Sequence, residues 1–448
     1  MGKKWPKVIR DPVHNIVPFE DCACDRLLLE LINAKELQRL RRIKQLGVSN
    51  FVFPGADHTR FSHSIGVMHI ARMFLERITG PLKRDINELH SKAVLAAALL
   101  HDVGHGPFSH AFEKISGENH EKRTLEIIRD PSTEVHQILS DASSDGAPEL
   151  PELLDAFFSE DPLHSTDLEE SSTFCLSQIV SSQLDADRFD YLLRDSRGTG
   201  TGYGRFDLAW LLQNLFLDRK SRFYLGYKAM LAAEQYVYAR YHMYRSVYFH
   251  KTTRSAEVML QLLFQRYQEL LQQATLDHDR KTIAPGTPPG ILRAFSDDLS
   301  LADYLQLDDC SITEFWRSCE ASNDSVLKKL GGGLLNRRLY KAIDLTHVPG
   351  ARVVEFVEKA KAFLKQQGMD PEYALAHDSP ADTPYKPYDP ATETSAPQIF
   401  VEHEPGQIKE LSRCSEMVHE LTKKYTLVRY YCPAEYRDEI ERIAEQVK

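Results

Sequence analysis

The sequence predicts a mainly α fold with short β-hairpins and a small mixed α/β lobe near the C-terminus. Apolar residues recur at helical spacing in several long segments. Runs of β-forming residues are few and short, as in VIRDPVHNIVPF near the N-terminus and QIFVEHE near the C-terminus. Helices therefore make up most of the expected fold.

Length and composition restrict the class of protein. A chain of 448 residues can bury a large core and hold more than one domain. Its net charge of −10 argues against broad binding of nucleic acids. The sequence has no apolar stretch long enough to span a membrane and no signal-peptide pattern. Its seven cysteines are scattered, apart from the neighbouring Cys22 and Cys24. We expect a cytoplasmic protein with free thiols and no membrane or nucleic-acid partner.

The first elements follow from local patterns. Residues 8–19 combine β-formers with an Asp-Pro turn, which predicts a hairpin. Residues 24–45 carry apolar side chains at helical spacing, and Gly47 ends that helix. Residues 52–78 predict a Pro-Gly turn, a polar loop and then a helix.

Residues 86–101 form the most informative helix. Its VLAAALL run is apolar on all sides, which is typical of a buried helix, and it ends at His101 and Asp102. Burying an imidazole and a carboxylate without partners is costly. Because a divalent cation would make both side chains ligands, we expect a metal ion here.

The rest of the chain predicts helices at 173–195, 208–216 and 229–273, with a strand at 222–228. Loops rich in proline or glycine follow at 275–290 and 376–406, and strands are expected at 398–404 and 426–433, before a final helix. We divide the chain into an N-terminal hairpin and helix (1–50), a catalytic core (51–265), a helical extension (266–375) and a Pro-rich loop with a small mixed lobe (376–448).

Three segments concentrate side chains that bind metals. These are His58 and His63, then His101 and Asp102, and then the run Asp185, Asp187 and Asp190. Each segment alone is weak evidence, because single histidines on helices are mostly structural. Histidine and carboxylate ligands from three helices together describe a site that activates water for hydrolysis.

The motifs RFSHS, LLHDVGHGPFSH and DADRFDYLLRD resemble those of the HD-domain phosphohydrolases, and within them the deoxynucleoside triphosphate (dNTP) triphosphohydrolases. QRLRRIKQLG, YRSVYFHK, RRLYK and LVRYYCP are also similar to segments of that group. The resemblance covers most of residues 7–265 and implies an HD-domain helical core.

The resemblance also implies roles for individual residues. The metal ligands would be His63, His101, Asp102 and Asp187, holding one divalent ion (Fe, Mn, Mg or Ni), while His58 stays unassigned. The catalytic residues would be His105, His110, Glu113 and His120, with His110 as proton donor. Glu113 stands where the animal members have aspartate.

Substrate contacts are implied in the same way. Arg60, Arg188 and Arg240 would bind the triphosphate, whose negative charge needs cations. Tyr191 and Asp195 share a helix face with Asp187. Asp195 and Gln45 would hydrogen-bond the sugar 3′-hydroxyl. Tyr248 and Leu46 would pack against C2′ and exclude a ribose 2′-hydroxyl.

Members of the family are often homo-oligomers, dimers or tetramers, with allosteric nucleotide sites between subunits. The positions that resemble those contacts are Lys7, Asn33, Arg41, Arg205, Lys251, Arg337 and Lys341. Asn33 stands where the animal members use an aspartate to recognise guanine, so a GTP requirement is not expected here.

Three functions remain open from the sequence. The first is a metal-dependent dNTP triphosphohydrolase. The second is an HD-type nuclease or a hydrolase of another nucleotide, since the same chemistry cuts phosphodiesters. The third is a non-catalytic nucleotide-sensing oligomer. The sequence contains all four implied metal ligands and the histidines that follow them. This argues against the third function, because a sensor needs no site that activates water.

Overall fold

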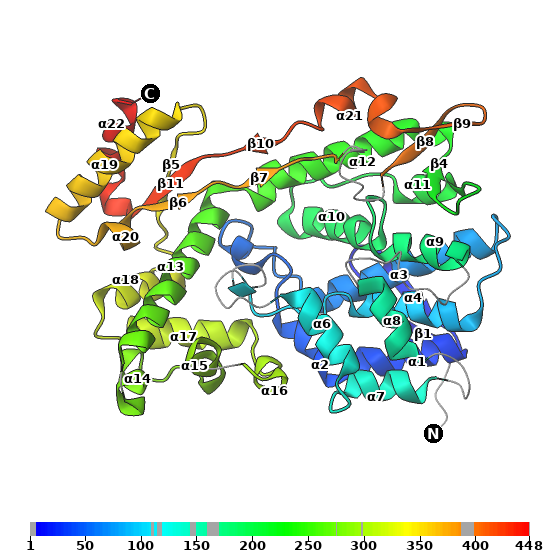
Figure 1. The fold of residues 1–448 in the computed structure, drawn as a ribbon, viewed down its shortest axis with the longest axis horizontal. Coiled ribbons are helices and arrows are strands. Elements are labelled where there is room, and N and C mark those ends of the chain that lie inside the picture. The colour runs from blue at the N-terminus through cyan, green and yellow to red at the C-terminus, as the bar shows by residue number, and fades with distance from the viewer. Residues whose placement is uncertain are drawn as a thin grey trace.

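The computed structural model describes residues 6–108, 112–113, 119–143, 149–158, 170–274, 276–296, 299–386 and 398–447. The described residues are mainly α-helical, as predicted, with four small β-sheets (Figure 1). None of the helices in these ranges is long and apolar enough to cross a membrane.

The predicted N-terminal hairpin is present as strands β1 (Lys7–Asp11) and β2 (Asn15–Phe19). The single helix expected at 24–45 is instead α1 (Ala23–Asn33), α2 (Lys35–Arg39) and a 3₁₀ turn, η1 (Leu40–Arg42). Beyond the break at Ala34, Arg39 is 2% exposed and donates to the Leu307 carbonyl at 2.9 Å. This long-range contact is invisible to local periodicity.

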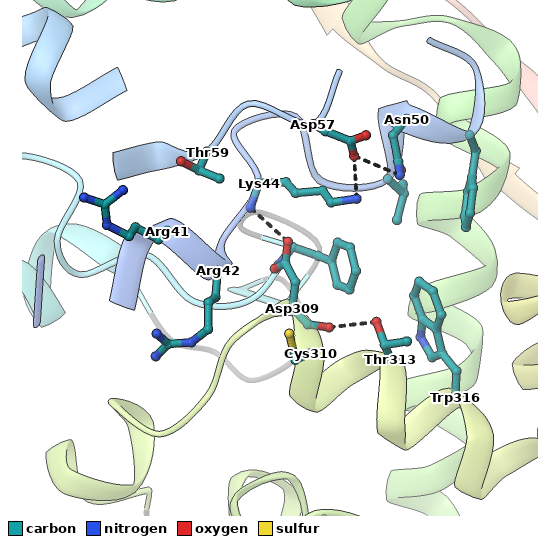
Figure 2. Close-up of a pocket in the computed structure, with 13 residues that line it drawn as sticks. Arg41, Arg42, Lys44, Asn50, Asp57, Thr59, Asp309, Cys310, Thr313 and Trp316 are labelled. Atoms are coloured by element: carbon teal, nitrogen blue, oxygen red, sulfur yellow. Dashed lines mark hydrogen bonds and ion pairs between the residues drawn. The ribbon is translucent and has the colours of Figure 1, made fainter. Parts of the chain in front are cut away.

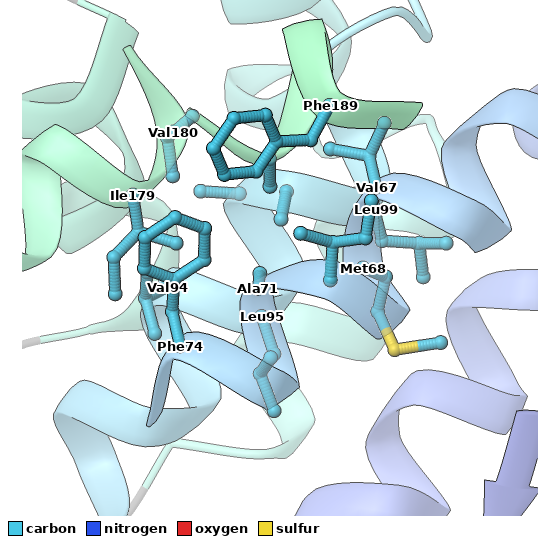
Figure 3. Packing of buried hydrophobic residues seen from close by; sticks show 14 of the residues in the cluster. Val67, Met68, Ala71, Phe74, Val94, Leu95, Leu99, Ile179, Val180 and Phe189 are labelled. Carbon is cyan, nitrogen blue, oxygen red and sulfur yellow. The ribbon is translucent and has the colours of Figure 1, made fainter. Parts of the chain in front are cut away.

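Helices α3 (Arg60–Thr79), α4 (Glu88–Leu100), α9 (Glu170–Val180) and α10 (Ala186–Thr199) form the centre of the core. Every residue from Ala93 to Leu100 is buried, which confirms the prediction for α4. Figure 3 shows side chains of α3 and α4 interleaved with Ile179, Val180 and Phe189. Because the helices that carry the candidate site are buried on several sides, its geometry is held by the core.

Two long predicted helices are interrupted. The segment 173–195 splits into α9 and α10 because Asp185 caps α10, accepting from the amides of Arg188 (2.7 Å) and Ser182 (2.9 Å). The segment 229–273 contains α12 (Met230–Met243), a π-helical turn, η4 (Tyr244–Tyr248), and α13 (Lys251–Gln273). Such π turns often occur at functional sites.

Further helices surround this core and extend it. Their bounds are η2 (Gly47–Phe51), α6 (His120–Arg129), α7 (Glu134–Asp141), α8 (Leu150–Phe158), α11 (Leu208–Gln213), η3 (Tyr227–Ala229), α14 (Asp277–Ile283), α15 (Pro289–Ser296), α16 (Leu301–Tyr304), α17 (Asp309–Glu320), α18 (Ser325–Leu335), α19 (Gly350–Gln366), α20 (Pro371–Ala374), η5 (Leu411–Arg413), α21 (Glu416–Glu420), η6 (Ala434–Tyr436) and α22 (Arg437–Glu445).

The C-terminal strands divide between two regions. Strand β8 (Phe400–Glu404) pairs with β9 (Gln407–Glu410) and lies parallel to β4 (Phe223–Leu225), which pairs with β3 (Leu215–Leu217). Strand β11 (Arg429–Cys432) lies between β5 (Lys341–Asp344) and β6 (Ala376–Asp378), and β10 (Tyr425–Thr426) pairs with β7 (Ala381–Asp382). Strand pairing thus crosses the predicted boundary between residues 375 and 376.

The mixed α/β region therefore combines β5, β6 and β11 with α19 and α22, whose buried side chains form a cluster of their own. Residues such as Ile399, Val401 and Leu411 instead join the main helical core. Figure 1 shows the orange segment around β8 and α21 returning to the green helices.

Candidate active site

The four residues implied as metal ligands come from three core helices and meet at one place. His63 lies on α3, His101 and Asp102 follow the last turn of α4, and Asp187 lies in the first turn of α10. His63 Nε2 lies 2.9 Å from Asp187 Oδ1 and 3.3 Å from His101 Nε2. His101 Nε2 lies 3.4 Å from Asp102 Oδ1 and 3.6 Å from Asp187 Oδ1. Atoms about 2.1 Å from one ion lie roughly 3.0 to 3.4 Å apart, so these side chains fit a divalent cation.

Hydrogen bonds behind the two histidines fix their orientation. His63 Nδ1 lies 2.8 Å from Asp190 Oδ2, and His101 Nδ1 lies 2.9 Å from the Ala98 carbonyl. Each acceptor takes the ring proton on Nδ1, so Nε2 of both rings faces the centre of the cluster, where a cation could replace the Nε2 proton of His63. This arrangement is typical of metal-binding histidines, whose other nitrogen donates to a carboxylate or carbonyl.

The electrostatics of the cluster favour a positive charge at its centre. Burial would lower the pKa of His63, but hydrogen bonds to Asp187 and Asp190 raise it to about 10. Burial would raise the pKa of Asp187, but the two imidazoles hold it below its usual range. Arg60 and the neighbouring histidines likewise keep the pKa of Asp102 well below its usual range, against the effect of burial. The carboxylates are therefore anionic at neutral pH and suited to bind a cation.

Asp190 connects this cluster to the N-terminal hairpin. It is fully buried, and its Oδ1 lies 2.6 Å from Nε2 of His14, in the turn between β1 and β2. Arg194 binds the same carboxylate at 2.7 Å and also donates to Asp11 at 2.8 Å. The sequence singled out Asp190 as one of three aspartates but gave His14 no role. A histidine in a turn carries no local signal for a partner 176 residues away.

A second histidine cluster begins at Asp102. His105 Nε2 lies 3.2 Å from Asp102 Oδ1, and His105 Nδ1 lies 3.0 Å from Glu113 Oε1. His120 Nδ1 lies 3.0 Å from the same Glu113 oxygen, and the two imidazoles stack with centroids 3.9 Å apart. Burial, with Arg60 nearby, lowers the pKa of His105 to about 4. The side chain of Glu113 is longer than the aspartate of the animal members, and this length is compatible with its contacts to the imidazoles of His105 and His120. His110 lies outside the described residues.

The residues predicted to contact the sugar lie together. Tyr248 Oη donates a hydrogen bond to one carboxylate oxygen of Asp195 at 2.7 Å, and His58 Nε2 lies 2.7 Å from the other oxygen. Tyr191 packs edge-on against Tyr248 with centroids 6.3 Å apart. The structure thus gives His58 a partner that the sequence left unassigned.

Gln45 and Leu46 occupy the segment that leads into this region. The side-chain oxygen of Gln45, Oε1, is buried and has no hydrogen-bond partner within the described parts of the chain. The backbone N–H of Gln45 donates to the His58 carbonyl at 3.0 Å. Leu46 is half-buried against the main core. An acceptor left without a donor favours a ligand hydroxyl at this place.

The three predicted phosphate-binding arginines all have carboxylate neighbours. Arg60 pairs with Asp102, and Arg188 Nε lies 3.5 Å from Asp185 Oδ2. Arg240 makes two 3.1 Å contacts with Asp382 of β7. A phosphate would therefore share or replace these partners.

The predicted regulatory residues are spread over several elements. Lys7 opens β1, Asn33 ends α1, Lys251 opens α13, Lys341 opens β5 and Arg205 precedes α11. The Arg41 guanidinium lies 3.6 Å from the centroid of the Phe61 ring. Arg337 donates to the Phe51 carbonyl at 2.8 Å. Their role between subunits stays a prediction.

Known proteins are similar to this chain over most of its length. The HD domain family model matches residues 60–147, and the HD associated region matches residues 206–281. YwfO of Bacillus subtilis (strain 168) is 37% identical over 419 residues, which cover 93% of this chain and 90% of YwfO. The deoxynucleoside triphosphate triphosphohydrolase SAMHD1 homolog of Dictyostelium discoideum is 28% identical over 368 residues, which cover 77% of this chain and 61% of that protein.

A solved structure extends the similarity to the whole fold. A phosphohydrolase from Bacteroides thetaiotaomicron VPI-5482 superposes with a TM-score of 0.76 at 30% identity, covering 96% of this chain and all of that one. The HD domain match spans His63, His101 and Asp102, three of the four residues that the sequence predicts as metal ligands. The chain belongs to the HD-domain phosphohydrolases, in the group that carries the HD-associated region and includes the dNTP triphosphohydrolases.

Proposed function

We propose that this protein hydrolyses dNTPs to a deoxynucleoside and inorganic triphosphate, by attack of water on the α-phosphate. The convergence of His63, His101, Asp102 and Asp187 carries the proposal, because their geometry fits a catalytic metal site. The similarity to a dNTP triphosphohydrolase of Dictyostelium discoideum supports the choice of substrate.

A divalent cation in this site supplies Lewis acidity and a nucleophilic water for phosphate hydrolysis. His63 and His101 would hold the ion through Nε2, because their Nδ1 contacts to Asp190 and the Ala98 carbonyl fix the rings in that orientation. Arg60 lies against Asp102, where it can also reach a phosphate oxygen. Nitrogen and carboxylate ligands suit Fe, Mn, Mg or Ni.

The second histidine cluster moves the proton that the reaction requires. The leaving 5′-oxygen must gain a proton when its bond to phosphorus breaks. Glu113 bridges His105 and His120, and a carboxylate between two imidazoles can pass a proton from one ring to the other. We assign these three residues, together with His110, to general acid catalysis.

Sugar selection rests on Tyr248 and Asp195. Tyr248 donates to Asp195, so both side chains are held in place before substrate arrives. Asp195 and Gln45 then bind the 3′-hydroxyl, while Tyr248 and Leu46 fill the space of a ribose 2′-hydroxyl. Tyr191 packs against Tyr248 on this side of the site, and Arg188 and Arg240 join Arg60 in binding the triphosphate.

The proposal includes assembly and regulation. The protein acts as a homo-oligomer, a dimer or tetramer, and a nucleotide activator binds the basic residues Lys7, Arg41, Arg205, Lys251, Arg337 and Lys341. Phosphates would offset the repulsion between these charges when subunits meet. Light scattering with and without nucleotide tests this part.

The decisive experiment incubates purified protein with each dNTP, each NTP and single-stranded DNA in Mn²⁺, Fe²⁺, Mg²⁺ or Ni²⁺ and resolves the products. Deoxynucleoside and triphosphate from dNTPs alone are expected. Degradation of DNA alone would favour a nuclease, and diphosphate products would favour another nucleotide hydrolase. Binding without turnover under every condition would favour a nucleotide sensor.

A further inference from the structure

His58 has no role in the proposed reaction, although it lies beside the predicted sugar site. Its side chain is 12% exposed, and that of Asp195 is 2% exposed. Nε2 of His58 lies 2.7 Å from Asp195 Oδ1, and since a carboxylate only accepts, His58 is the donor. Nδ1 of His58 is buried and has no hydrogen-bond partner among the residues that the structure describes. Within these residues, the imidazole therefore hydrogen-bonds to Asp195 alone.

The backbone of His58 holds Gln45, the other residue predicted to bind the 3′-hydroxyl. The N–H of Gln45 donates to the His58 carbonyl at 3.0 Å. Lys44 and Thr59 form an antiparallel bridge next to this hydrogen bond (Figure 2). His58 therefore joins Gln45, which it holds through its main chain, to Asp195, which it holds through its side chain.

The place of the His58 ring depends on a glycine near the end of α10. A Cβ atom at Gly198 would lie 2.4 Å from His58 Nδ1, which is closer than side-chain atoms approach one another. A Cβ atom at Gly55 would likewise lie 2.6 Å from the Gly198 carbonyl oxygen. Helix α10 also carries Asp195. The ring is thus packed against the same helix that carries its acceptor.

Asp195 has one donor on each carboxylate oxygen. Tyr248 Oη donates to Oδ2 at 2.7 Å, and His58 Nε2 lies against Oδ1. Two donors on opposite oxygens fix the plane of the carboxylate, and each oxygen keeps a further lone pair that can accept from a ligand. These lone pairs therefore have a fixed direction before substrate binds.

We propose that His58 is the positioning residue for recognition of the substrate's 3′-hydroxyl, because it orients Asp195 and Gln45 together. This role rests on the proposed function. His58 acts through these two residues, since its Nε2 and its carbonyl already bind them. A nucleotide without a 3′-hydroxyl leaves the buried acceptors of Asp195 and Gln45 unpaired and is rejected for that reason.

A matched pair of substrates tests this role. The pair is a dNTP and the 2′,3′-dideoxynucleoside triphosphate (ddNTP) of the same base, which lacks only the 3′-hydroxyl. The readout is the ratio of their kcat/KM values, from which the fraction of folded protein cancels, so a loss of stability cannot mimic the effect. The native protein should prefer the dNTP by at least about tenfold, the value of a hydrogen bond to a charged group.

His58→Ala should lower this preference by about tenfold, because Asp195 loses one of its two donors. The fall should come from kcat/KM for the dNTP, while that for the ddNTP stays at the native level. His58→Gln is the conservative variant, since its amide nitrogen can donate to Asp195, and it should restore part of the preference.

Asp57→Asn is the matched control. Asp57 directly precedes His58, its side chain is 58% exposed, and its carboxylate lies 2.7 Å from Nζ of Lys44. Figure 2 shows it joined to Lys44 and Asn50. This variant should keep the native preference, because it removes a neighbouring charge and leaves the contact between His58 and Asp195 in place.

The inference and the proposed function can fail separately. A native protein that hydrolyses both substrates equally, an unchanged preference in His58→Ala, or equal losses in His58→Ala and His58→Gln would overturn the inference alone. Absence of dNTP hydrolysis with every metal would refute the proposed function. Calorimetric Kd values of the dNTP and the ddNTP then test His58. A preference that His58→Ala loses would support its role, and equal Kd values in the native protein, or no binding, would overturn it.

Discussion

The two histidine clusters of the core share Asp102 but differ in what lies against Nδ1 of their imidazole rings. In the first cluster, Asp190 and the Ala98 carbonyl hold Nδ1 of His63 and His101, so the Nε2 atoms converge. In the second cluster, Glu113 lies between Nδ1 of two stacked rings. Converging lone pairs suit a cation, whereas imidazoles alternating with a carboxylate suit proton transfer. The same residue types are thus arranged for different chemistry.

The largest expected effect comes from removing a ligand of the first cluster. Asp187→Ala should abolish metal binding and lower dNTP hydrolysis by at least about 10²-fold, because even partners behind the ligands contribute that much. Metal content by mass spectrometry and product formation measure the two effects. Unchanged hydrolysis would show that the metal assignment is wrong.

A substitution in the second cluster should separate the two roles. Glu113→Gln keeps the size of the side chain but weakens proton exchange between His105 and His120. We expect kcat to fall by about 10²-fold while metal content stays at the native level. A loss of metal in this variant would mean that the second cluster also binds a cation.

Removing the contact between Asp190 and His63 should weaken metal binding less than removing a metal ligand. Asp190→Asn weakens the contact to His63 and should lower metal affinity by about 10- to 100-fold, measured by calorimetry. Because Asp190 also pairs with buried Arg194, circular dichroism must show that the variant folds. His14→Ala leaves the His63–Asp190 contact intact and should weaken binding less; an equal or larger loss would contradict the proposed order.

Sequence reasoning succeeded where the signal is local and failed where partners are distant. The apolar run of α4 predicts that this helix is buried, and the motifs around the histidines and aspartates identify the family. Asp185 is a local N-cap signal, with both capping partners three residues away, that the helical periodicity of 173–195 obscured. No local pattern reveals that His58 binds Asp195 or that His14 reaches Asp190. The C-terminal strands pair with β4 and β5 because of tertiary packing, which propensity does not report.

A smaller effect on activity is expected from substitutions at Tyr248, which is predicted to lie beside the sugar. Tyr248→Phe keeps the ring but removes the hydrogen bond to Asp195, so KM for dNTPs should rise by about tenfold. Discrimination against ribonucleotides should remain in this variant and fall in Tyr248→Ala. Equal discrimination in both would contradict a steric role for the ring.

The last expected effect is on stability rather than on activity and concerns Asp309, which is not a member of either histidine cluster. Burial raises its pKa to about 6, despite hydrogen bonds from the Lys44 and Phe108 amides. The folded state then favours the protonated acid, so its contribution to stability falls as pH rises from about 4 to 6, by at most about 3 kcal/mol. Denaturant unfolding of the native protein and Asp309→Asn should differ in slope within this window; parallel curves would refute the shift.

The central claim is that the first cluster, and not the second, holds the metal. Anomalous diffraction from crystals grown with Mn²⁺ tests it most directly. We expect a peak within about 2.3 Å of Nε2 of His63 and of His101, with oxygen atoms of Asp102 and Asp187 beside it. A peak between His105 and His120 with none at the first cluster would contradict it.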